Sequence, residues 1–312
     1  MEILKGIDKD ILYTKGIKNF FLRIRKDETM QWIDEIHSCL PELLSKWEIT
    51  SIAPNQISRY GLVLEASRAN GDDIVLKFTP SFINRFEREA EAYNILPKSY
   101  MCELLDVDYT RRCLVLKKLD KKSYASFDDR QKLRAFYKNA VNDAVKYTGQ
   151  NLKYIGYYQQ ELKKRCDDTS VLRFCNKEIK DALTLAWNLY IQIFEDSPLY
   201  ILHGDLIDLN VLDDGNRYYG IDPIGFIAPI ELECVRFMRN EIRKHPENGY
   251  RVRFDQLTEF FSEFFDRDRL KTMFVIDMAY CTYNSVFEND TADETKIDLE
   301  LINMIPEVVN EG

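Results

Sequence analysis

The sequence predicts an α+β protein with two lobes, the first built on an antiparallel sheet and the second mainly helical. Short strand-like runs separated by turn residues lie between residues 57 and 119. From residue 133 onwards, apolar residues recur at helical spacing in two long stripes. The chain has 312 residues, a length that suits two lobes and allows a substantial core. We therefore expect an N-terminal lobe over residues 1–119 and a helical C-terminal lobe over residues 120–312.

A helical segment is predicted ahead of the sheet. Ile33, Ile36 and Leu40 recur at helical spacing, and the pattern continues to Trp47. Pro41 interrupts it, and because proline lacks a backbone donor we expect either two helices or a kink at that point.

The predicted sheet consists of short runs joined by turns, with Asn70-Gly71-Asp72 as the hairpin signal between the first two. The runs are residues 57–66, 73–78, 102–107 and 113–119. In the second lobe, the apolar stripes cover residues 133–144 and 179–193, and further helices are expected over residues 234–242, 255–265 and 270–287.

A group of polar side chains surrounds a tight turn in the second lobe. An apolar strand over residues 199–202 leads into His203-Gly204-Asp205-Leu206-Ile207-Asp208-Leu209-Asn210. A second turn signal, Asp213-Asp214-Gly215-Asn216, predicts a hairpin that brings Asn210 and Asp222 onto neighbouring strands. The pattern places a carboxylate, a carboxamide and a second carboxylate close together.

These residue types suit phosphoryl transfer, which requires a base to orient the attacking hydroxyl and hard oxygen ligands for magnesium. We assign Asp205 as the base and Asn210 and Asp222 as the magnesium ligands. His203 is expected to brace the loop, because Asp205 already fills the role of base. The competing interpretation is that His-Gly-Asp and Ile-Asp-Pro are unrelated turn sequences, since such residues are common in loops. The complete pattern favours the catalytic interpretation.

The segments HGDLIDLNVL and YYGIDPIGF resemble the motifs of the aminoglycoside/hydroxyurea antibiotic resistance kinases, the streptomycin 6-phosphotransferase type, within the protein-kinase-like aminoglycoside phosphotransferases. The resemblance extends from about Met30 to about Glu288. It implies a bilobal protein-kinase-like fold that binds ATP and magnesium between its lobes. It also implies transfer of the γ-phosphate to a hydroxyl of a small molecule, with an aminoglycoside such as streptomycin, or hydroxyurea, as the acceptor.

The resemblance further implies a phosphate-binding pair in the first lobe. Lys77 ends an apolar strand, where kinases keep the lysine that meets the α- and β-phosphates. Glu89 matches the acidic position of the family's REAxAxxxL pattern and would pair with Lys77. By themselves, an edge-strand lysine and helix glutamates usually face water. Gly61 stands where kinases carry a glycine-rich loop, but a single glycine fits an ordinary strand or bulge residue slightly better.

The chain departs from the family pattern after Asp222. The family usually continues with a Gly-Asp-Pro element, whereas residues 227–230 here read Ile-Ala-Pro-Ile. Only Glu233 falls where the family's later acidic residue would be, and Ile207 replaces a frequent histidine. This departure does not affect the predicted magnesium ligands. It does mean that the family pattern does not specify the acceptor pocket of this chain. The alternatives are a kinase of an endogenous small alcohol and a nucleotide-binding pseudokinase with weak or no turnover.

Composition excludes several other classes. A net charge of −9 argues against nucleic acid as a partner and is compatible with a cationic small-molecule acceptor. The N-terminus lacks the layout of a signal peptide and no apolar run is long enough to span a bilayer, so we expect a cytoplasmic protein without membrane contact. Seven cysteines without a CxxC pair and three scattered histidines argue against a zinc site or a disulfide framework.

An acidic run near the C-terminus has two interpretations. Its carboxylates would suit the guanidinium or ammonium groups of an aminoglycoside. Such runs more often face water, which is the preferred interpretation. The run comprises Glu288, Asp290, Asp293, Glu294, Asp298 and Glu300.

Overall fold

The computed structural model describes residues 8–55, 61–120, 123–246, 249–288 and 292–305. The chain divides into two compact units, and each is described by itself. The first unit comprises Met1–Asn94 and Cys102–Asp120, and the second comprises Ile95–Met101 and Lys121–Gly312. The short stretch before Cys102 belongs to the second unit because Met101 pairs with Gly220 and the Tyr100 carbonyl accepts the Gly220 N–H at 2.7 Å.

The first unit is built on a five-stranded antiparallel sheet with strand order β1-β2-β3-β5-β4. The hairpin predicted at residues 70–72 is confirmed, and Gly71 supplies its left-handed residue with φ of 90°. β1 was not predicted, because its sequence follows the helical segment without a turn signal. The strands are β1 (Ile49–Pro54), β2 (Leu62–Arg68), β3 (Asp73–Phe78), β4 (Leu104–Asp108) and β5 (Cys113–Lys117).

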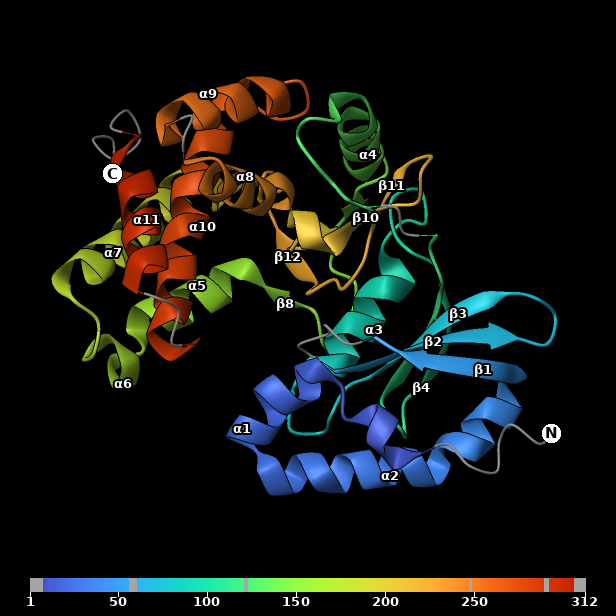
Figure 1. The fold of residues 1–312 in the computed structure, drawn as a ribbon. Coiled ribbons are helices and arrows are strands. Elements are labelled where there is room, and N and C mark those ends of the chain that lie inside the picture. The colour runs from blue at the N-terminus through green and yellow to red at the C-terminus, as the bar shows by residue number, and fades with distance from the viewer. Residues whose placement is uncertain (1–7, 56–60, 121–122, 247–248, 289–291, 306–312) are drawn as a thin grey trace. The chain divides into compact units, whose positions relative to one another are not determined.

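A long helix, α2 (Lys26–Lys46), packs against this sheet (Figure 1). It runs as one helix through Pro41, so the prediction of two helices is wrong. Its apolar stripe, which includes Ile33, Leu40 and Leu44, is buried in one core with the strands. Burying such a stripe outweighs the one backbone hydrogen bond that proline removes. The other helices of this part are η2 (Lys9–Leu12), η3 (Ile17–Phe21), α1 (Leu22–Ile24) and α3 (Phe86–Ile95).

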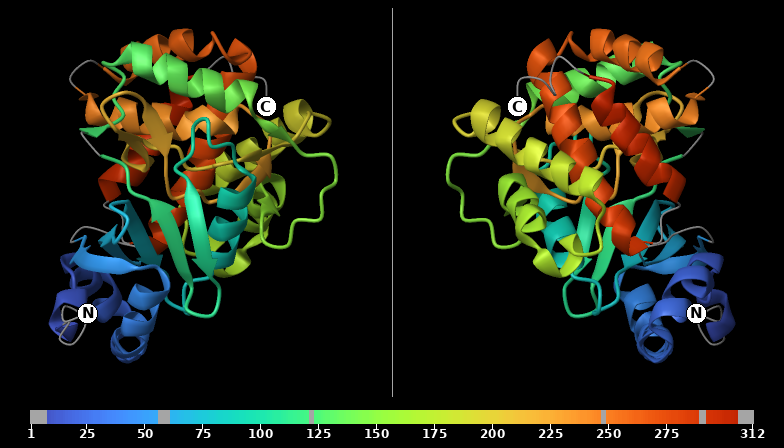
Figure 2. Two further views of the ribbon diagram at one scale, coloured as in Figure 1. Left: turned by 90° about the vertical axis from the view of Figure 1, so that its right-hand side faces the viewer. Right: turned by 90° about the vertical axis from the view of Figure 1, so that its left-hand side faces the viewer.

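The second unit is mainly helical, as predicted. Helices α7, α10 and α11 pack against one another, and the right-hand view of Figure 2 faces them. The expected helices are all present, whereas α5, α6 and α11 were not predicted. The helices are α4 (Arg130–Asn142), α5 (Tyr158–Asp167), α6 (Thr169–Leu172), α7 (Lys177–Phe194), α8 (Leu232–Lys244), α9 (Tyr250–Phe261), α10 (Arg267–Glu288) and α11 (Ala292–Asn303). No helix within the described ranges is long and apolar enough to cross a membrane.

Two small sheets in the second unit hold the segments that carry the predicted site. One has the order β11-β10-β6 and the other β7-β9-β12-β8. The chain passes from β9 to β10 and later from β11 to β12, so two connecting loops join the same pair of sheets. These loops must therefore run close together. The strands are β6 (Ser123–Tyr124), β7 (Val145–Lys146), β8 (Gly156–Tyr157), β9 (Tyr200–Leu202), β10 (Val211–Asp213), β11 (Tyr218–Gly220) and β12 (Phe226–Ala228).

Candidate active site

The loop from β9 to β10, residues 203–210, begins with a turn that only glycine accommodates. Gly204 has φ of 75°, in the left-handed region that favours glycine. A Cβ at this position would lie 2.5 Å from a ring carbon of Phe226, a distance that no real contact tolerates. The His203 carbonyl accepts the N–H groups of Ile224 and Gly225, both at 3.0 Å. The loop is thus fixed against the segment that follows Asp222.

His203 braces this loop. Its side chain is buried, and Nε2 lies 2.7 Å from the carbonyl oxygen of Ile221. The other ring nitrogen, Nδ1, accepts the backbone N–H of Asp205 at 3.2 Å. One nitrogen therefore donates and the other accepts, which requires the neutral imidazole with its proton on Nε2. The histidine links two backbone segments, as its predicted bracing role requires.

Asp205 and Asn210 are in direct contact. The amide nitrogen of Asn210 donates to the backbone carbonyl of Asp205 at 2.9 Å and to its carboxylate Oδ2 at 3.0 Å. With its nitrogen held on Asp205, Asn210 directs its amide oxygen away from that carboxylate. An amide oxygen is one of the hard ligands that magnesium accepts.

Asp222 lies beside Asn210, because the Ile221 N–H donates to the Asn210 carbonyl at 2.8 Å. The expectation that both residues lie on strands is wrong in detail, since Asn210 ends the short helix η4 (Asp208–Asn210) and Asp222 follows the end of β11. Asp222 has φ of 59°, a left-handed conformation unusual outside glycine. Non-glycine residues keep such a conformation where surrounding structure imposes it, often at functional sites.

The oxygen atoms of Asn210 and Asp222 fit magnesium rather than zinc. Magnesium is usually held by one or two carboxylate or amide oxygens together with phosphate oxygens and water. In the part of the chain that the structure describes, no group of three or more His, Cys, Asp or Glu side chains is arranged to hold a metal. An amide oxygen and a carboxylate oxygen suit an ion that also takes phosphate oxygens.

Glu233, at the start of α8, was given no role from the sequence beyond its place in the family pattern. Its two carboxylate oxygens accept the backbone N–H groups of His203 at 3.0 Å and Gly204 at 3.1 Å. Burial raises the pKa of Glu233 to about 7, against the lowering effect of these hydrogen bonds and of Tyr100. Burial and the nearby Glu233 in turn hold the pKa of Tyr100 well above its usual range. Glu233 therefore fastens the turn at Gly204 to α8.

Asp208 fastens the other end of the loop to the same helix, a role that was not predicted. Its buried carboxylate accepts the Asn240 amide at 3.2 Å and pairs with Lys244. The segment after Asp222, which reads Ile-Ala-Pro-Ile at residues 227–230, contains β12, paired with β9 and β8. The contacts of Asp208 with α8 and of β12 with β9 and β8 join segments that are far apart in the sequence. No local sequence signal could therefore have revealed them.

In the first unit, Lys77 and Glu89 form the predicted pair. Lys77 Nζ donates to Glu89 Oε1 at 2.7 Å, and the two side chains are only 4% and 1% exposed. The alternative, that both side chains face water, is wrong. Glu87, two residues away on α3, pairs with Arg112 instead.

Gly61 is required by packing. A Cβ at Gly61 would lie 2.3 Å from the carbonyl oxygen of Phe78, so its backbone approaches β3 too closely for a side chain. This packing agrees with the expectation of an ordinary strand or bulge residue, and Gly61 lies immediately before β2. The neighbouring positions of the expected phosphate loop, residues 58–60, lie outside the described residues.

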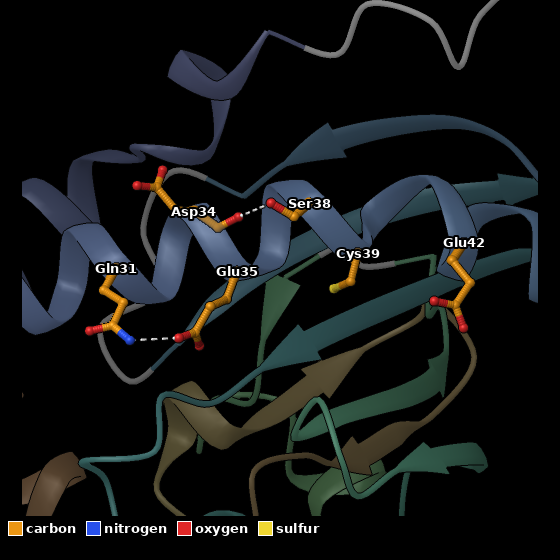
Figure 3. A pocket seen from close by; sticks show the side chains of 6 residues that line it. All are labelled: Gln31, Asp34, Glu35, Ser38, Cys39 and Glu42. Carbon is orange, nitrogen blue, oxygen red and sulfur yellow. Dashed lines mark hydrogen bonds between the residues drawn. The ribbon is translucent and has the colours of Figure 1, made fainter.

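A shallow hollow on the exposed side of α2 is acidic (Figure 3). Its carboxylates have local partners: Asp34 pairs with Lys9, Glu42 with Arg111, and Glu35 accepts the Gln31 amide at 2.9 Å. None of the predicted site residues lines it. The hollow is lined by Gln31, Asp34, Glu35, Ser38, Cys39 and Glu42.

The acidic run near the C-terminus is not uniformly solvated. Asp298 is buried and pairs with Arg239 at 2.6 Å and Arg243 at 2.7 Å, so the preferred interpretation is wrong for this residue. Glu300 is exposed and pairs with Lys296 at 3.9 Å. Asp290 lies outside the described residues, as do the side chains of Glu288, Asp293 and Glu294.

Comparison with known proteins gives no sequence relative and a clear structural likeness. No family model and no curated protein sequence matches the chain. A crystal structure of aminoglycoside phosphotransferase APH(4)-Ia with ADP and hygromycin B has 11% identity and a TM-score of 0.58, covering 87% of this chain and 97% of that one.

Choline kinase LicA from Streptococcus pneumoniae has 12% identity and a TM-score of 0.60, and the match covers 89% of this chain and 100% of that one. A choline/ethanolamine kinase family protein from Mesorhizobium loti has 17% identity and a TM-score of 0.61, and the match covers 90% of this chain and 100% of that one. At these identities the likeness shows a shared fold. The predicted α+β, bilobal protein-kinase-like fold is confirmed.

Proposed function

We propose that the protein is an ATP- and magnesium-dependent phosphotransferase that moves the γ-phosphate to a hydroxyl of a small molecule. The observation that carries the proposal is the grouping of Asp205, Asn210 and Asp222. Asn210 touches the Asp205 carboxylate with its amide nitrogen, and its backbone is bonded to the residue before Asp222. The residues that we propose as base and magnesium ligands thereby adjoin one another, and phosphoryl transfer requires such an arrangement.

Each residue has one role in this proposal. Asp205 orients the acceptor hydroxyl for in-line attack and accepts its proton, while Asn210 and Asp222 hold the magnesium ion. Lys77 contacts the α- and β-phosphates, and Glu89 keeps its ammonium group in place. The bound magnesium neutralises charge on the phosphates. Because the residues are held before the substrate arrives, the protein contributes mainly positioning and electrostatic stabilisation.

For the acceptor, we place an aminoglycoside of the streptomycin type first. The structurally similar proteins include an aminoglycoside phosphotransferase in complex with hygromycin B and a choline kinase. Recognition of a quaternary ammonium group, such as that of choline, uses free aromatic faces. Near Asp205, the ring of Tyr280 already carries Arg165 at 3.4 Å and Arg236 at 5.6 Å. The Tyr280 ring is therefore not available to a choline-type acceptor, and this is the observation that puts an amino sugar first.

The test is transfer of radiolabelled phosphate from ATP, with magnesium, to a panel headed by streptomycin and including other aminoglycosides, hydroxyurea and choline. Asp205→Ala should lower turnover by about 10²–10⁴-fold. It should leave ATP affinity, measured by calorimetry, nearly unchanged. The exposed Asp128→Ala is the matched control and should keep full turnover. Transfer that persists in Asp205→Ala would refute the assignment of the base.

The alternative is a nucleotide-binding pseudokinase. The observation that favours it is in the sequence after Asp222, where residues 227–230 read Ile-Ala-Pro-Ile in place of the family's Gly-Asp-Pro element. ATP binding without turnover on any acceptor, and without slow hydrolysis of ATP by water, would establish this alternative.

A further inference from the structure

Arg236 stands beside the candidate base, although no sequence pattern singled it out. It lies on α8, and its side chain is 9% exposed. Its Nε and Nη2 atoms donate to the two carboxylate oxygens of Asp277 at 3.1 and 3.2 Å. The remaining nitrogen, Nη1, lies 3.3 Å from Asp205 Oδ1. One guanidinium group therefore joins a fully buried carboxylate to the carboxylate of the candidate base.

The guanidinium group is held rigidly. Asp277, on α10, also accepts the hydroxyl of Tyr158 at 3.0 Å. The rings of Phe226 and Tyr280 lie 5.8 and 5.6 Å from the guanidinium carbon. Burial by itself would lower the pKa of Arg236, but the nearby charges, chiefly that of Asp277, hold it well above its ordinary value. The group stays charged, and its planar fork has little freedom to turn.

The two oxygens of Asp205 are each held by a different donor. Oδ1 faces Arg236 Nη1 at 3.3 Å, and Oδ2 accepts the Asn210 amide at 3.0 Å. Two donors on the two oxygens of one carboxylate fix the plane of the group. That plane decides where the lone pairs of Asp205 point, and hence where an acceptor hydroxyl must lie.

We propose that Arg236, anchored by Asp277, is a positioning residue that sets the orientation of the Asp205 carboxylate for phosphoryl transfer. The inference rests on the proposed function and adds to it the buried chain Asp277–Arg236–Asp205. A misplacement of about 1 Å in a reacting group can lower a rate about 100-fold. Loss of the anchor should therefore lower kcat while substrate affinities change little.

The same helix offers a matched control. Arg239 lies three residues further along α8 and pairs with the buried Asp298 through two hydrogen bonds of 2.6 and 3.0 Å. It is an arginine–aspartate pair of the same kind, with Arg239 17% and Asp298 1% exposed, and Asp298 lies on α11 rather than in the candidate site. If Arg236 serves only to hold α8 in place, changes at the two pairs should have equal effects on turnover.

The experiment is a double-mutant cycle on kcat. Removing Arg236 alone would leave Asp277 buried without its partner, so the main variant is Arg236→Met/Asp277→Asn, with Arg236→Lys as a milder second variant. In the wild-type background the main variant should lower kcat about 10–100-fold, with KM for ATP changed less than about 3-fold. In an Asp205→Asn background the same change should lower kcat less than about 3-fold, because Arg236 acts through Asp205. Arg239→Met/Asp298→Asn should keep kcat within about 3-fold in either background.

The outcomes separate the two proposals. An equal loss of kcat in the wild-type and the Asp205→Asn backgrounds would overturn the positioning role, as would a main variant with full turnover. Wild-type protein that turns over no ATP, with or without the acceptor panel, would overturn the proposed function and this inference with it. Arg236→Lys should show a smaller loss than the main variant, since it keeps the charge but not the fork.

Discussion

The buried pair of Lys77 and Glu89 allows stability and function to be separated. Lys77 Nζ and Glu89 Oε1 lie 2.7 Å apart, and both side chains are almost fully buried. Removing one partner leaves the other charge in a low-dielectric interior, which costs about 3–5 kcal/mol. A domain has about 5–15 kcal/mol of stability in total, so Glu89→Leu and Lys77→Met should each be severely destabilising. Replacing both by apolar residues removes both charges, and Lys77→Met/Glu89→Leu should recover most of that loss.

Turnover should not recover with stability. Every variant without Lys77 lacks the proposed contact with the phosphates, so the double variant should fold well and still transfer little phosphate. Urea unfolding gives the free energy of unfolding for the two single variants and the double variant, and radiolabelled ATP gives turnover. Glu87→Gln is the control, because Glu87 lies on the same helix and pairs with Arg112. Glu87→Gln should change the free energy of unfolding by less than about 1 kcal/mol. It should leave the turnover unchanged.

Two results would contradict this reasoning. If the double variant is as unstable as the single variants, an unpaired buried charge is not the cause of their loss of stability. If the double variant keeps wild-type turnover, Lys77 has no role on the phosphates.

Three further predictions concern the second unit. Because the folded-state pKa of Glu233 is raised from 4.5 to about 7, the folded chain holds this proton more tightly than the unfolded chain, and stability should fall by up to about 3 kcal/mol as the pH rises from about 4.5 to 7. Urea unfolding at pH 5 and pH 8 should show this slope in the wild type and its loss in Glu233→Gln. Gly204→Ala adds a Cβ 2.5 Å from the Phe226 ring at φ of 75°, so it should lower the free energy of unfolding by about 2–5 kcal/mol, and a loss below about 1 kcal/mol in the same urea experiment would contradict the close packing. Chelation of magnesium by EDTA should abolish phosphate transfer, and Asn210→Ala should raise the magnesium concentration for half-maximal transfer at least about tenfold; an unchanged requirement would remove Asn210 from the metal site.

Local patterns in the sequence were sufficient for the central strands of the first unit, for the long helices up to residue 288 and for placing Asn210 beside Asp222. The turn at Asn70-Gly71-Asp72 and the turn at residues 213–216 are encoded by adjacent residues, because each has a glycine, Gly71 or Gly215, that adopts the left-handed backbone without strain. The second hairpin brings the backbones beside Asn210 and Asp222 into contact. The apolar stripes of the long helices follow equally from local spacing.

Contacts between distant segments were decided only by the tertiary structure. Glu233 binds the backbone of a turn 29 and 30 residues earlier, and Arg236 joins Asp205 to Asp277 across 31 and 41 residues. A buried carboxylate and a solvated one look alike in a sequence, since burial depends on what packs over the residue. The same reason explains α2 passing through Pro41, because the core beneath that helix supplies the stabilisation that its own residues do not. The sequence determined which side chains could do the chemistry, and the packing of distant segments decided which of them are held in place.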